Sequence, residues 1–465
     1  MTGQVGDHAV VLGAGMSGLL TARVLADSFT RVTVVDRDEL TGVGEPRRGV
    51  PQGHHVHGLQ PRGGEIIEEL FPGFTEETVA RGAQLQDTVN DAHWHFEGRR
   101  LRKAPSSMAT VAAGRPFLER YVRDRVEALP NVTFLQRHDV VGLDTTPDRT
   151  RIVGVRIQPH GGATGAGAAG AGSTGTGATD SEEAGGEPGG LPADLVVDAT
   201  GRGSRTPVWL EEFGYPKVPE QRARIGLGYA TRHYRTRPGS THDGRTLVVV
   251  ASADLPRGAV CTRIEGDRYV LTTYGILGDH PPTDPEGFDG YLKSLAVPDV
   301  AEFAQSAEPL DEPVAYRFPV SLRRRYEHMD RFPAGLLVVG DGVCSFNPTY
   351  AQGMTVAALG ALTLRRHLRR GTPLRARAFF RDLARDAVDP SWEAMNLNDL
   401  AFPGVEGART LKIRVAHAYV ALVQRAATRD AKVAEAFIRV VSLMSGPESL
   451  MRPGMLLRVL RHGRV

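Results

Sequence analysis

The chain has 465 residues, of which 41% are hydrophobic and 24% are charged, an ordinary composition that excludes disorder of the whole chain. This length can bury two or three hydrophobic cores, so we expect one interrupted domain and one inserted domain. The formal net charge is +2, and no basic run is interleaved with aromatic residues. Both facts argue against a nucleic-acid partner.

Cys261 and Cys344 are the two cysteines, and they lie far apart without the spacing of metal ligands. This usage fits a reducing compartment. We recognise no signal peptide, and no apolar stretch is long enough to span a bilayer. We therefore expect a cytoplasmic protein without a transmembrane segment.

The first forty residues predict a βαβ unit. Residues 8–12 have the pattern of a buried strand, residues 16–26 that of a helix, and residues 31–36 that of the next strand. Asp36 ends the second strand, where an acid would accept a ribose hydroxyl.

Glycines at positions 13, 15 and 18 join the first strand to the helix. Gly13 would form a tight turn, Gly15 would let the backbone approach a pyrophosphate, and Gly18 would let the helix pack closely on the strand. The N-terminus of the helix would then face the phosphates with its positive end. A G-x-G-x-x-G motif in this context predicts a dinucleotide site.

A second glycine-rich motif lies more than three hundred residues later, at 338–342. Asp341 follows an apolar strand, where its carboxylate can accept a ribityl hydroxyl. Gly353 and Met354 open a helix whose N-terminus can face the pyrimidine oxygen of a flavin. Two such motifs with one complete fingerprint between them indicate a flavin site closed by both ends of the chain.

The middle of the chain changes character twice. Residues 161–190 are mostly Gly, Ala, Thr and acids, which predicts a flexible surface loop between strand-like segments at 151–158 and 191–199. Residues 224–321 alternate with turns and predict a hairpin-rich antiparallel sheet. Beyond Met354 the pattern is helical to the end, with breaks at 403–404 and 452–454.

With these motifs, the chain resembles class A-type flavin monooxygenases of the p-hydroxybenzoate hydroxylase fold. Within that group it is most similar to the flavin epoxidases of polyether antibiotic pathways, of the lasalocid and monensin kind. The segments that carry the resemblance are Gly13–Gly18, Asp36–Asp38, Arg48–His57, Arg115–Glu119, Asp198–Ser204 and Gly340–Met354. The family usually has Asp-Gly where this chain has Thr200-Gly201, so the role of Thr200 is open.

The resemblance implies an α/β fold with three parts: a Rossmann-like FAD-binding domain, an inserted antiparallel β-sheet domain for the substrate, and a C-terminal helical region. We place the first at 1–85, 105–215 and 331–370, the second at 86–104 and 216–330, and the third at 371–465.

The resemblance also implies a set of cofactor and pocket residues. We expect FAD to be bound by Gly13, Gly15, Met16, Ser17, Gly18, Asp36, Arg37, Arg48, Arg115, Asp341, Gly353 and Met354. No nucleophile or acid-base pair is certain. Candidates for the pocket wall are Gln52, His54, His55, Phe346, Asn347, Pro348 and Tyr350. The histidines at 54, 55 and 57 have no acid or cysteine at ligand spacing, so we expect no metal.

The implied activity is epoxidation of alkenes in a polyketide-like apolar substrate through a flavin C4a-hydroperoxide, which the protein must keep dry and protonated. NAD(P)H would supply the electrons, directly or through a flavin reductase. Aromatic hydroxylation and geranylgeranyl-type reduction on the same fold stay open. Aromatic hydroxylases tend to carry Ala-His after the Gly-Asp pair, where this chain has Gly342-Val343. Flavin halogenases carry a W-x-W-x-I-P signature, which this chain lacks.

The segment from Gly407 to the end contains eleven Lys or Arg and three Asp or Glu, a local charge of +8. Basic amphipathic helices can lie on an anionic membrane or bind an acidic acyl carrier protein. A helical layer packed on the cofactor domain, with a solvated basic face, is the alternative interpretation.

Overall fold

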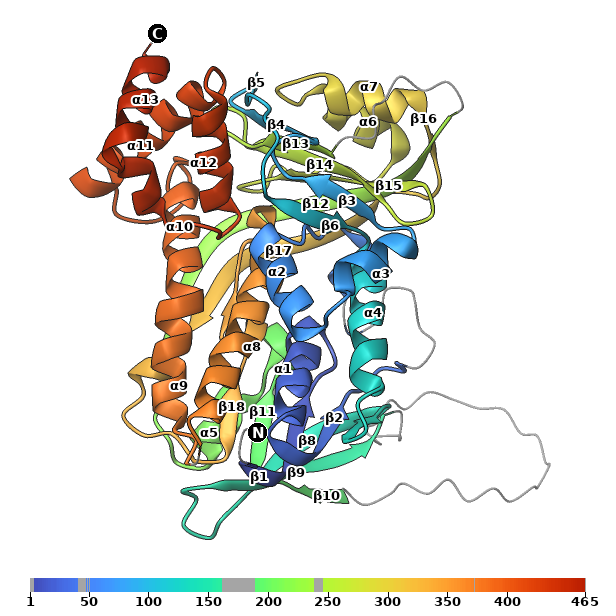
Figure 1. Ribbon diagram of the computed structural model, residues 1–465, viewed down its shortest axis with the longest axis vertical. Coiled ribbons are helices and arrows are strands. Elements are labelled where there is room, and N and C mark those ends of the chain that lie inside the picture. Colours follow the sequence, from blue (N-terminus) through green and yellow to red (C-terminus); the bar gives the residue numbers. More distant parts are fainter. Residues whose placement is uncertain are drawn as a thin grey trace, which may run out of the picture.

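The structure is a computed structural model that describes residues 4–40, 47, 49, 51–160, 189–237, 246–371 and 373–464. Two predictions fall outside these residues: the loop at 161–190, except for its last two residues, and Arg48. Figure 1 shows a parallel sheet with its helices in the lower half and a second sheet above it.

A five-stranded parallel sheet forms the base of the cofactor domain, in the order β18–β11–β1–β2–β7. Its strands are β1 (Gly6–Leu12), β2 (Phe29–Val35), β7 (Val132–Leu135), β11 (Leu195–Asp198) and β18 (Leu336–Val338). Leu12 pairs with Val35 and Asp198, and Asp198 pairs with Val338. The four strands therefore end level, and the two glycine-rich motifs leave the sheet at the same edge.

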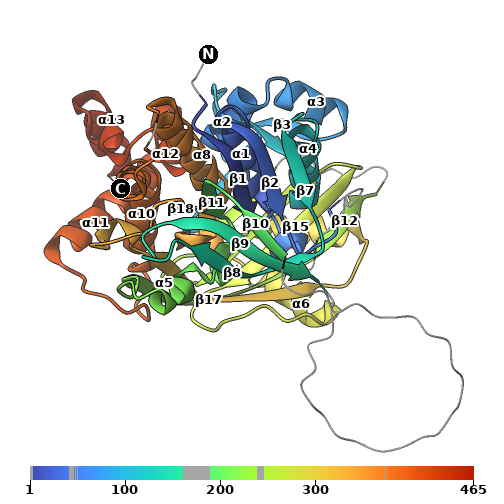
Figure 2. The same ribbon diagram turned by 90° about the horizontal axis from the view of Figure 1, so that it is seen from below.

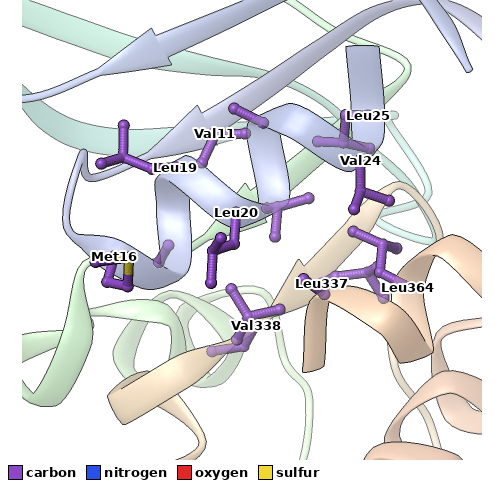
Figure 3. Close-up of a cluster of buried hydrophobic side chains, with 14 of the residues drawn as sticks. Val11, Met16, Leu19, Leu20, Val24, Leu25, Leu337, Val338 and Leu364 are labelled. Atoms are coloured by element: carbon purple, nitrogen blue, oxygen red, sulfur yellow. The ribbon is translucent and has the colours of Figure 1, made fainter. Parts of the chain in front are cut away.

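Helix α1 (Met16–Ala26) packs one face on this sheet and the other on α8 (Gly353–Arg369). The first two turns of α1 carry no charged residue, which is why nearly all of this helix can be buried. Figure 3 shows Met16, Leu20 and Val24 facing Leu337 and Val338 of β18, with Leu364 of α8 closing the cluster. The predicted βαβ unit is confirmed.

The second sheet has nine strands. They are β4 (Ala92–Phe96), β5 (Arg99–Arg100), β12 (Glu220–Thr236), β13 (Thr246–Val250), β14 (Arg257–Ile264), β15 (Arg268–Gly275), β16 (Ala307–Pro309), β17 (Val314–Arg324) and β19 (Cys344–Ser345). The predicted antiparallel pairing is confirmed for all but one pair: β13 and β4 run parallel. This pair joins segments about 150 residues apart, so no hairpin sets its direction.

Two smaller sheets flank these. One pairs β3 (Gln84–Asp87) with β6 (Ala109–Ala112), and the other contains β8 (His138–Thr145), β9 (Ile152–Pro159) and β10 (Gly189–Pro192). The strand expected at 191–199 is in fact two strands, because the chain leaves β10 for the small sheet and enters the parallel sheet as β11.

The remaining helices cover the sheets (Figure 1). They are α2 (Pro61–Leu70), α3 (Phe74–Ala80), α4 (Arg115–Glu127), α5 (Thr206–Glu212), α6 (Pro285–Lys293), α7 (Asp299–Ser306), α9 (Ala376–Leu383), α10 (Asp389–Asp399), α11 (Leu411–Ala427), α12 (Ala431–Val441) and α13 (Pro453–Gly463). Short helical turns are η1 (Pro51–His54), η2 (Gly201–Gly203), η3 (Tyr326–His328), η4 (Gly340–Gly342), η5 (Pro348–Tyr350), η7 (Pro447–Met451) and a π turn, η6 (Ala384–Val388). In the described part of the chain, none of the helices has the length and apolar character needed to cross a membrane.

The C-terminal helices divide between two cores. Phe379 and Phe380 of α9 and Trp392 of α10 join the core around the parallel sheet. Helices α11, α12 and α13 form a separate core, in which Phe437 contacts Phe96 of β4 edge-to-face at 5.2 Å. Figure 2 shows α11 and α13 at the rim, outside α12. The expected domain boundaries stay a prediction.

Gly18 tests the packing of α1. A Cβ at this position would lie 1.9 Å from the carbonyl oxygen of Gly13, a backbone atom that cannot move aside. We expect Gly18→Ala to lower the free energy of unfolding by about 2–3 kcal/mol, measured by urea denaturation. Gly454→Ala is the matched control, because a Cβ there meets no atom within 4 Å. Equal midpoints for the two variants would contradict the close packing.

Candidate functional site

The two glycine-rich motifs touch each other. Gly340, which opens η4, has a φ of 60°, and a Cβ there would lie 2.6 Å from Oγ of Ser17 in α1. Gly13 has a φ of 96°, and a Cβ there would lie 2.8 Å from the carbonyl oxygen of Ala199. Glycine is therefore required at both positions, and the segments that follow β1, β11 and β18 meet at one point.

The N-terminus of α1 is open at this point. Gly15 is the N-cap residue, no side chain caps the helix, and a Cβ on Gly15 would meet no protein atom within 4 Å. Ser17 Oγ is buried and has no hydrogen-bond partner among the described residues. A helix start with free N–H groups, a free hydroxyl and space for a ligand suits an anionic phosphate.

Arg47 lies behind the glycine turn, and its side chain is only 5% exposed. Its guanidinium donates to Glu119 Oε1 from Nε at 3.0 Å and to the carbonyl of Ala14 at 3.2 Å, and it lies 3.4 Å from Asp36 and 3.2 Å from Asp38. Burial opposes the charge on Arg47, but the three carboxylates outweigh it and raise its pKa. Arg47 therefore joins the end of β2 to α4.

The same network fixes Asp36. Its carboxylate accepts hydrogen bonds from the backbone N–H groups of Ala14 at 2.6 Å and Asp38 at 2.8 Å. Arg37, also expected at the cofactor, is exposed. Met16 is 2% exposed and belongs to the core, as does Met354, so these two can reach a ligand only through their backbone.

Asp341, Arg115 and Arg202 come from three segments and lie close enough for the two cations to act on the Asp341 carboxylate. Burial raises the pKa of Asp341, while Arg115 and Arg202 act in the opposite direction. The Asp341 side chain nevertheless keeps solvent-accessible surface, and no donor among the described residues contacts it. Arg115 Nε pairs with Glu119 Oε2 at 3.1 Å, and Arg202 donates to Ser345 Oγ at 3.2 Å. Asp341 is thus a free acceptor between two cations.

Thr200, whose role was open, has a structural one. Asp198 is fully buried and accepts from Thr200 N at 2.9 Å, Thr200 Oγ1 at 2.6 Å, Ser204 Oγ at 2.6 Å and Thr206 Oγ1 at 2.5 Å. These bonds shape the η2 turn that carries Arg202.

The three histidines near η1 have different surroundings. His54 is exposed. His55 is buried in the second sheet, where Nδ1 bonds Thr231 Oγ1 at 2.7 Å, its ring lies edge-on to Tyr229 at 4.6 Å, and burial lowers its pKa to about 3. The pKa of His57 is lowered to about 4 by burial and then by Arg115. His57, which was not among the expected pocket residues, therefore lies near Arg115 as a neutral imidazole. Gln52 is partly buried.

The expected wall segment runs from Phe346 to Tyr350 and is held by α10. Tyr350 Oη donates to Asp399 Oδ1 at 2.7 Å, and Asn347 Nδ2 donates to the same oxygen at 3.2 Å. Asn347 Oδ1 accepts from Thr349 N at 3.1 Å. Phe346 and Asn347 are buried, Tyr350 is partly buried, and Pro348 is exposed.

Asp399 itself is 1% exposed, and its second oxygen, Oδ2, has no partner among the described residues. Burial raises its pKa to about 6, while Tyr350 and Asn347 oppose the rise. The sequence gives little sign of this role, because Asp399 stands beside Asn398 in the short segment Leu397–Phe402 without a recognisable motif.

Four site residues lay outside the sequence prediction: Arg47, His57, Arg202 and Asp399. Three of them lie next to features that the sequence did single out. Arg47 precedes the expected Arg48, His57 lies in the segment with His54 and His55, and Arg202 follows the Thr200-Gly201 pair. No sequence motif pointed to Asp399. The described residues contain no group of three or more His, Cys, Asp or Glu that could hold a metal ion.

Protein Rv3254 of Mycobacterium tuberculosis strain H37Rv is 35% identical to this chain over 423 residues, covering 86% of the chain and 82% of that protein. The chain therefore belongs to the same family as Protein Rv3254. No protein-family model matches the chain.

Several solved structures with a similar architecture are flavin enzymes. The flavin-dependent brominase Bmp2 has a TM-score of 0.65 at 14% identity, covering 98% of this chain and 99% of its own. PqsL from Pseudomonas aeruginosa, a probable FAD-dependent monooxygenase, has a TM-score of 0.60 at 17% identity, covering 86% and 99%. PqsL has also been solved in complex with 2-aminobenzoylacetate. The chain thus has the fold of FAD-dependent monooxygenases and halogenases.

The raised pKa of Asp399 makes the free energy of unfolding depend on pH. The folded protein keeps this proton up to a pH of about 6, whereas the unfolded chain releases it near the ordinary value of 3.8. Stability therefore falls as pH rises from about 4 to about 6, by up to about 3 kcal/mol. We expect Asp399→Asn to gain thermal stability over the wild type across this interval.

Glu393 is an exposed acid on the same helix, so Glu393→Gln serves as the control and should follow the wild-type curve. Melting temperatures that change in parallel with pH for Asp399→Asn and the wild type would contradict the buried acid.

Proposed function

We propose that this protein is an FAD-dependent monooxygenase that epoxidises one or more alkenes of an apolar, polyketide-like substrate. The observation that carries the proposal is the meeting of an open helix N-terminus, a carboxylate without a donor (Asp341) and a second helix start at one edge of the parallel sheet. In open α/β sheets, this edge is where nucleotide cofactors bind.

The residues fit FAD group by group. The start of α1 would hold the pyrophosphate through backbone N–H groups, and Asp36 the adenosine ribose. Asp341 would accept a ribityl hydroxyl. The start of α8 has no side-chain cap, and a Cβ on Gly353 would meet no atom within 4 Å, so its N–H groups can face the flavin ring. Bound and reduced there, FAD would supply oxygen activation.

The chain's own residues would then bind, orient and exclude water. His57 is neutral at physiological pH, so it can accept a hydrogen bond near Arg115 without adding charge. Asn347 and Tyr350 would form the wall on the substrate side, held by Asp399. No proton-transferring triad is needed for this role, because positioning carries most of the specificity.

Two observations favour epoxidation over aromatic hydroxylation and halogenation, which occur on the same fold. The position after Gly342 is Val343, 5% exposed, where the resemblance places a histidine in aromatic hydroxylases. The tryptophans are scattered over β4, α5 and α10, and no lysine in the described ranges is buried, which disfavours a halogenase with an essential lysine.

Aromatic hydroxylation is the second candidate. Tyr229, Tyr274 and Phe318 belong to one buried cluster, and Tyr316, 5.4 Å from the ring of Tyr229, packs against it. Such a set of rings suits a planar aromatic substrate. PqsL, which holds 2-aminobenzoylacetate, adds support for a small-molecule substrate.

Gly15→Val separates cofactor binding from folding. Because the added side chain would enter open space, we expect the apoprotein to keep the wild-type melting temperature. The same side chain would fill the place of the pyrophosphate, so the absorbance of bound flavin after dialysis against FAD should be lost. A folded Gly15→Val protein with full FAD content would contradict the assignment.

The reaction is tested by mass spectrometry after aerobic incubation of the holoenzyme with a long triene ester of polyketide type. We expect a gain of one or more oxygen atoms with loss of the same number of alkenes. A gain of two hydrogens would indicate a reductase, and no change would redirect the search to aromatic substrates. Starting the reaction with NADPH alone, and with NADPH and a flavin reductase, tells whether the reductase is obligatory.

A further inference from the structure

We propose that helices α11 and α13, together with the end of the turn η7 that precedes α13, form a docking surface for an anionic lipid membrane. The surface contains four apolar residues, Leu411, Val415, Met451 and Leu457, and four cations, Lys412, Arg414, Arg452 and Arg461. We call these eight residues the C-terminal surface. The inference does not depend on the reaction proposed above.

The apolar residues are the first observation. Leu411 and Leu457 are 69% exposed, Met451 is 65% exposed and Val415 is 60% exposed, more than any other large hydrophobic residue in the described ranges. Leu411 and Val415 are one turn apart on the same face of α11. Exposed aliphatic side chains on a helical layer are typical of an interaction surface.

Charge is the second observation. Helices α11 and α13 contain no acidic residue, and the four cations of the C-terminal surface are exposed. Asp430, the nearby acid, is already engaged: Arg458 pairs with it at 2.6 Å, and its carboxylate caps α12. Glu448 of η7 is a second acid near the surface and is exposed. No ion pair joins the four cations to an acid within the described part of the chain, so the surface keeps an excess of positive charge.

The two helices form one layer. Tyr419 Oη of α11 donates to the carbonyl of Leu450 at 2.6 Å, and Arg429 Nη1 donates to the carbonyl of Arg464 at 2.8 Å. Helix α13 therefore runs beside α11 in the same direction. Figures 1 and 2 both place this pair at the edge of the molecule, outside α12.

The charge of the C-terminal surface also favours one kind of binding partner. If the C-terminal surface paired with the same surface of a second copy, the cations of α11 and α13 would face like charges, because these helices contain no acid. An acidic protein would satisfy the cations, but its own apolar residues would have to match four side chains spread over α11, η7 and α13, a match that a fluid membrane does not need. An anionic membrane satisfies both, because phosphates meet the Lys and Arg side chains while Leu, Val and Met enter the headgroup boundary.

The test is co-sedimentation of the full-length protein with vesicles of phosphatidylcholine and phosphatidylglycerol, and with vesicles of phosphatidylcholine alone. We expect the protein to pellet with the anionic vesicles at low salt and less so at high salt. Leu411→Ser with Val415→Ser should lower the partition coefficient roughly tenfold or more. Lys412→Glu with Arg414→Glu should lower it by a similar factor.

Val208→Ser with Lys217→Glu is the matched control, because both residues are exposed away from the C-terminal surface. It should bind as the wild type does, and all variants should melt as the wild type does, since the changed residues are exposed. Absence of binding to anionic vesicles, or full binding by the Leu411/Val415 variant, would overturn the proposal. A dimer in sedimentation velocity that this variant dissociates would assign the surface to a second copy, and binding only to an acidic carrier protein would assign it to that partner.

Discussion

The level ends of β1, β11 and β18 are the constraint on which the site depends. Leu12 lies opposite Asp198, and Asp198 opposite Val338, so three segments from distant parts of the chain turn at one edge. They approach so closely that a single Cβ at Gly13 or Gly340 would strike a neighbouring segment. A register shift of one residue in either pair would move Asp341 away from the start of α1.

Buried charge keeps the turns in place. Arg47 contacts Asp36, Asp38 and Glu119, and Glu119 also holds Arg115. Removing one member would leave an uncompensated charge in a buried setting, which costs more than the lost bond itself. The same arrangement explains why Asp341 can stay without a donor: Arg115 and Arg202 supply positive potential from a distance, so the carboxylate remains available to a ligand.

Features set by residues close together in the sequence could be predicted, whereas contacts between distant residues could not. The βαβ unit was predicted to within two residues, and the start of the helix at Gly353 was predicted as well, because glycine spacing and apolar periodicity are local signals. The end of that helix at Arg369 was missed, since the helical pattern was expected to continue to the break at 403–404. Arg47 and Asp399 were missed because their partners, Glu119 and Asn347, lie 72 and 52 residues away. His55 and His57 belong to the same sequence segment, so the sequence does not distinguish them. Their surroundings differ because the second sheet brings Thr231 into contact with His55.

The two sides of the proposed site therefore have different origins. The proposed cofactor side is built from strand ends whose register leaves little freedom. The proposed substrate side depends on α10, a helix that follows a π turn and is anchored by the ion pair of Asp389 with the buried Arg323. Such a π turn changes which residues of the following helix face inward. Here Met395 and Asp399 face the segment around Asn347. A change of one residue in that turn would rotate a different side chain toward Tyr350, so substrate preference can diverge while the cofactor fold is kept.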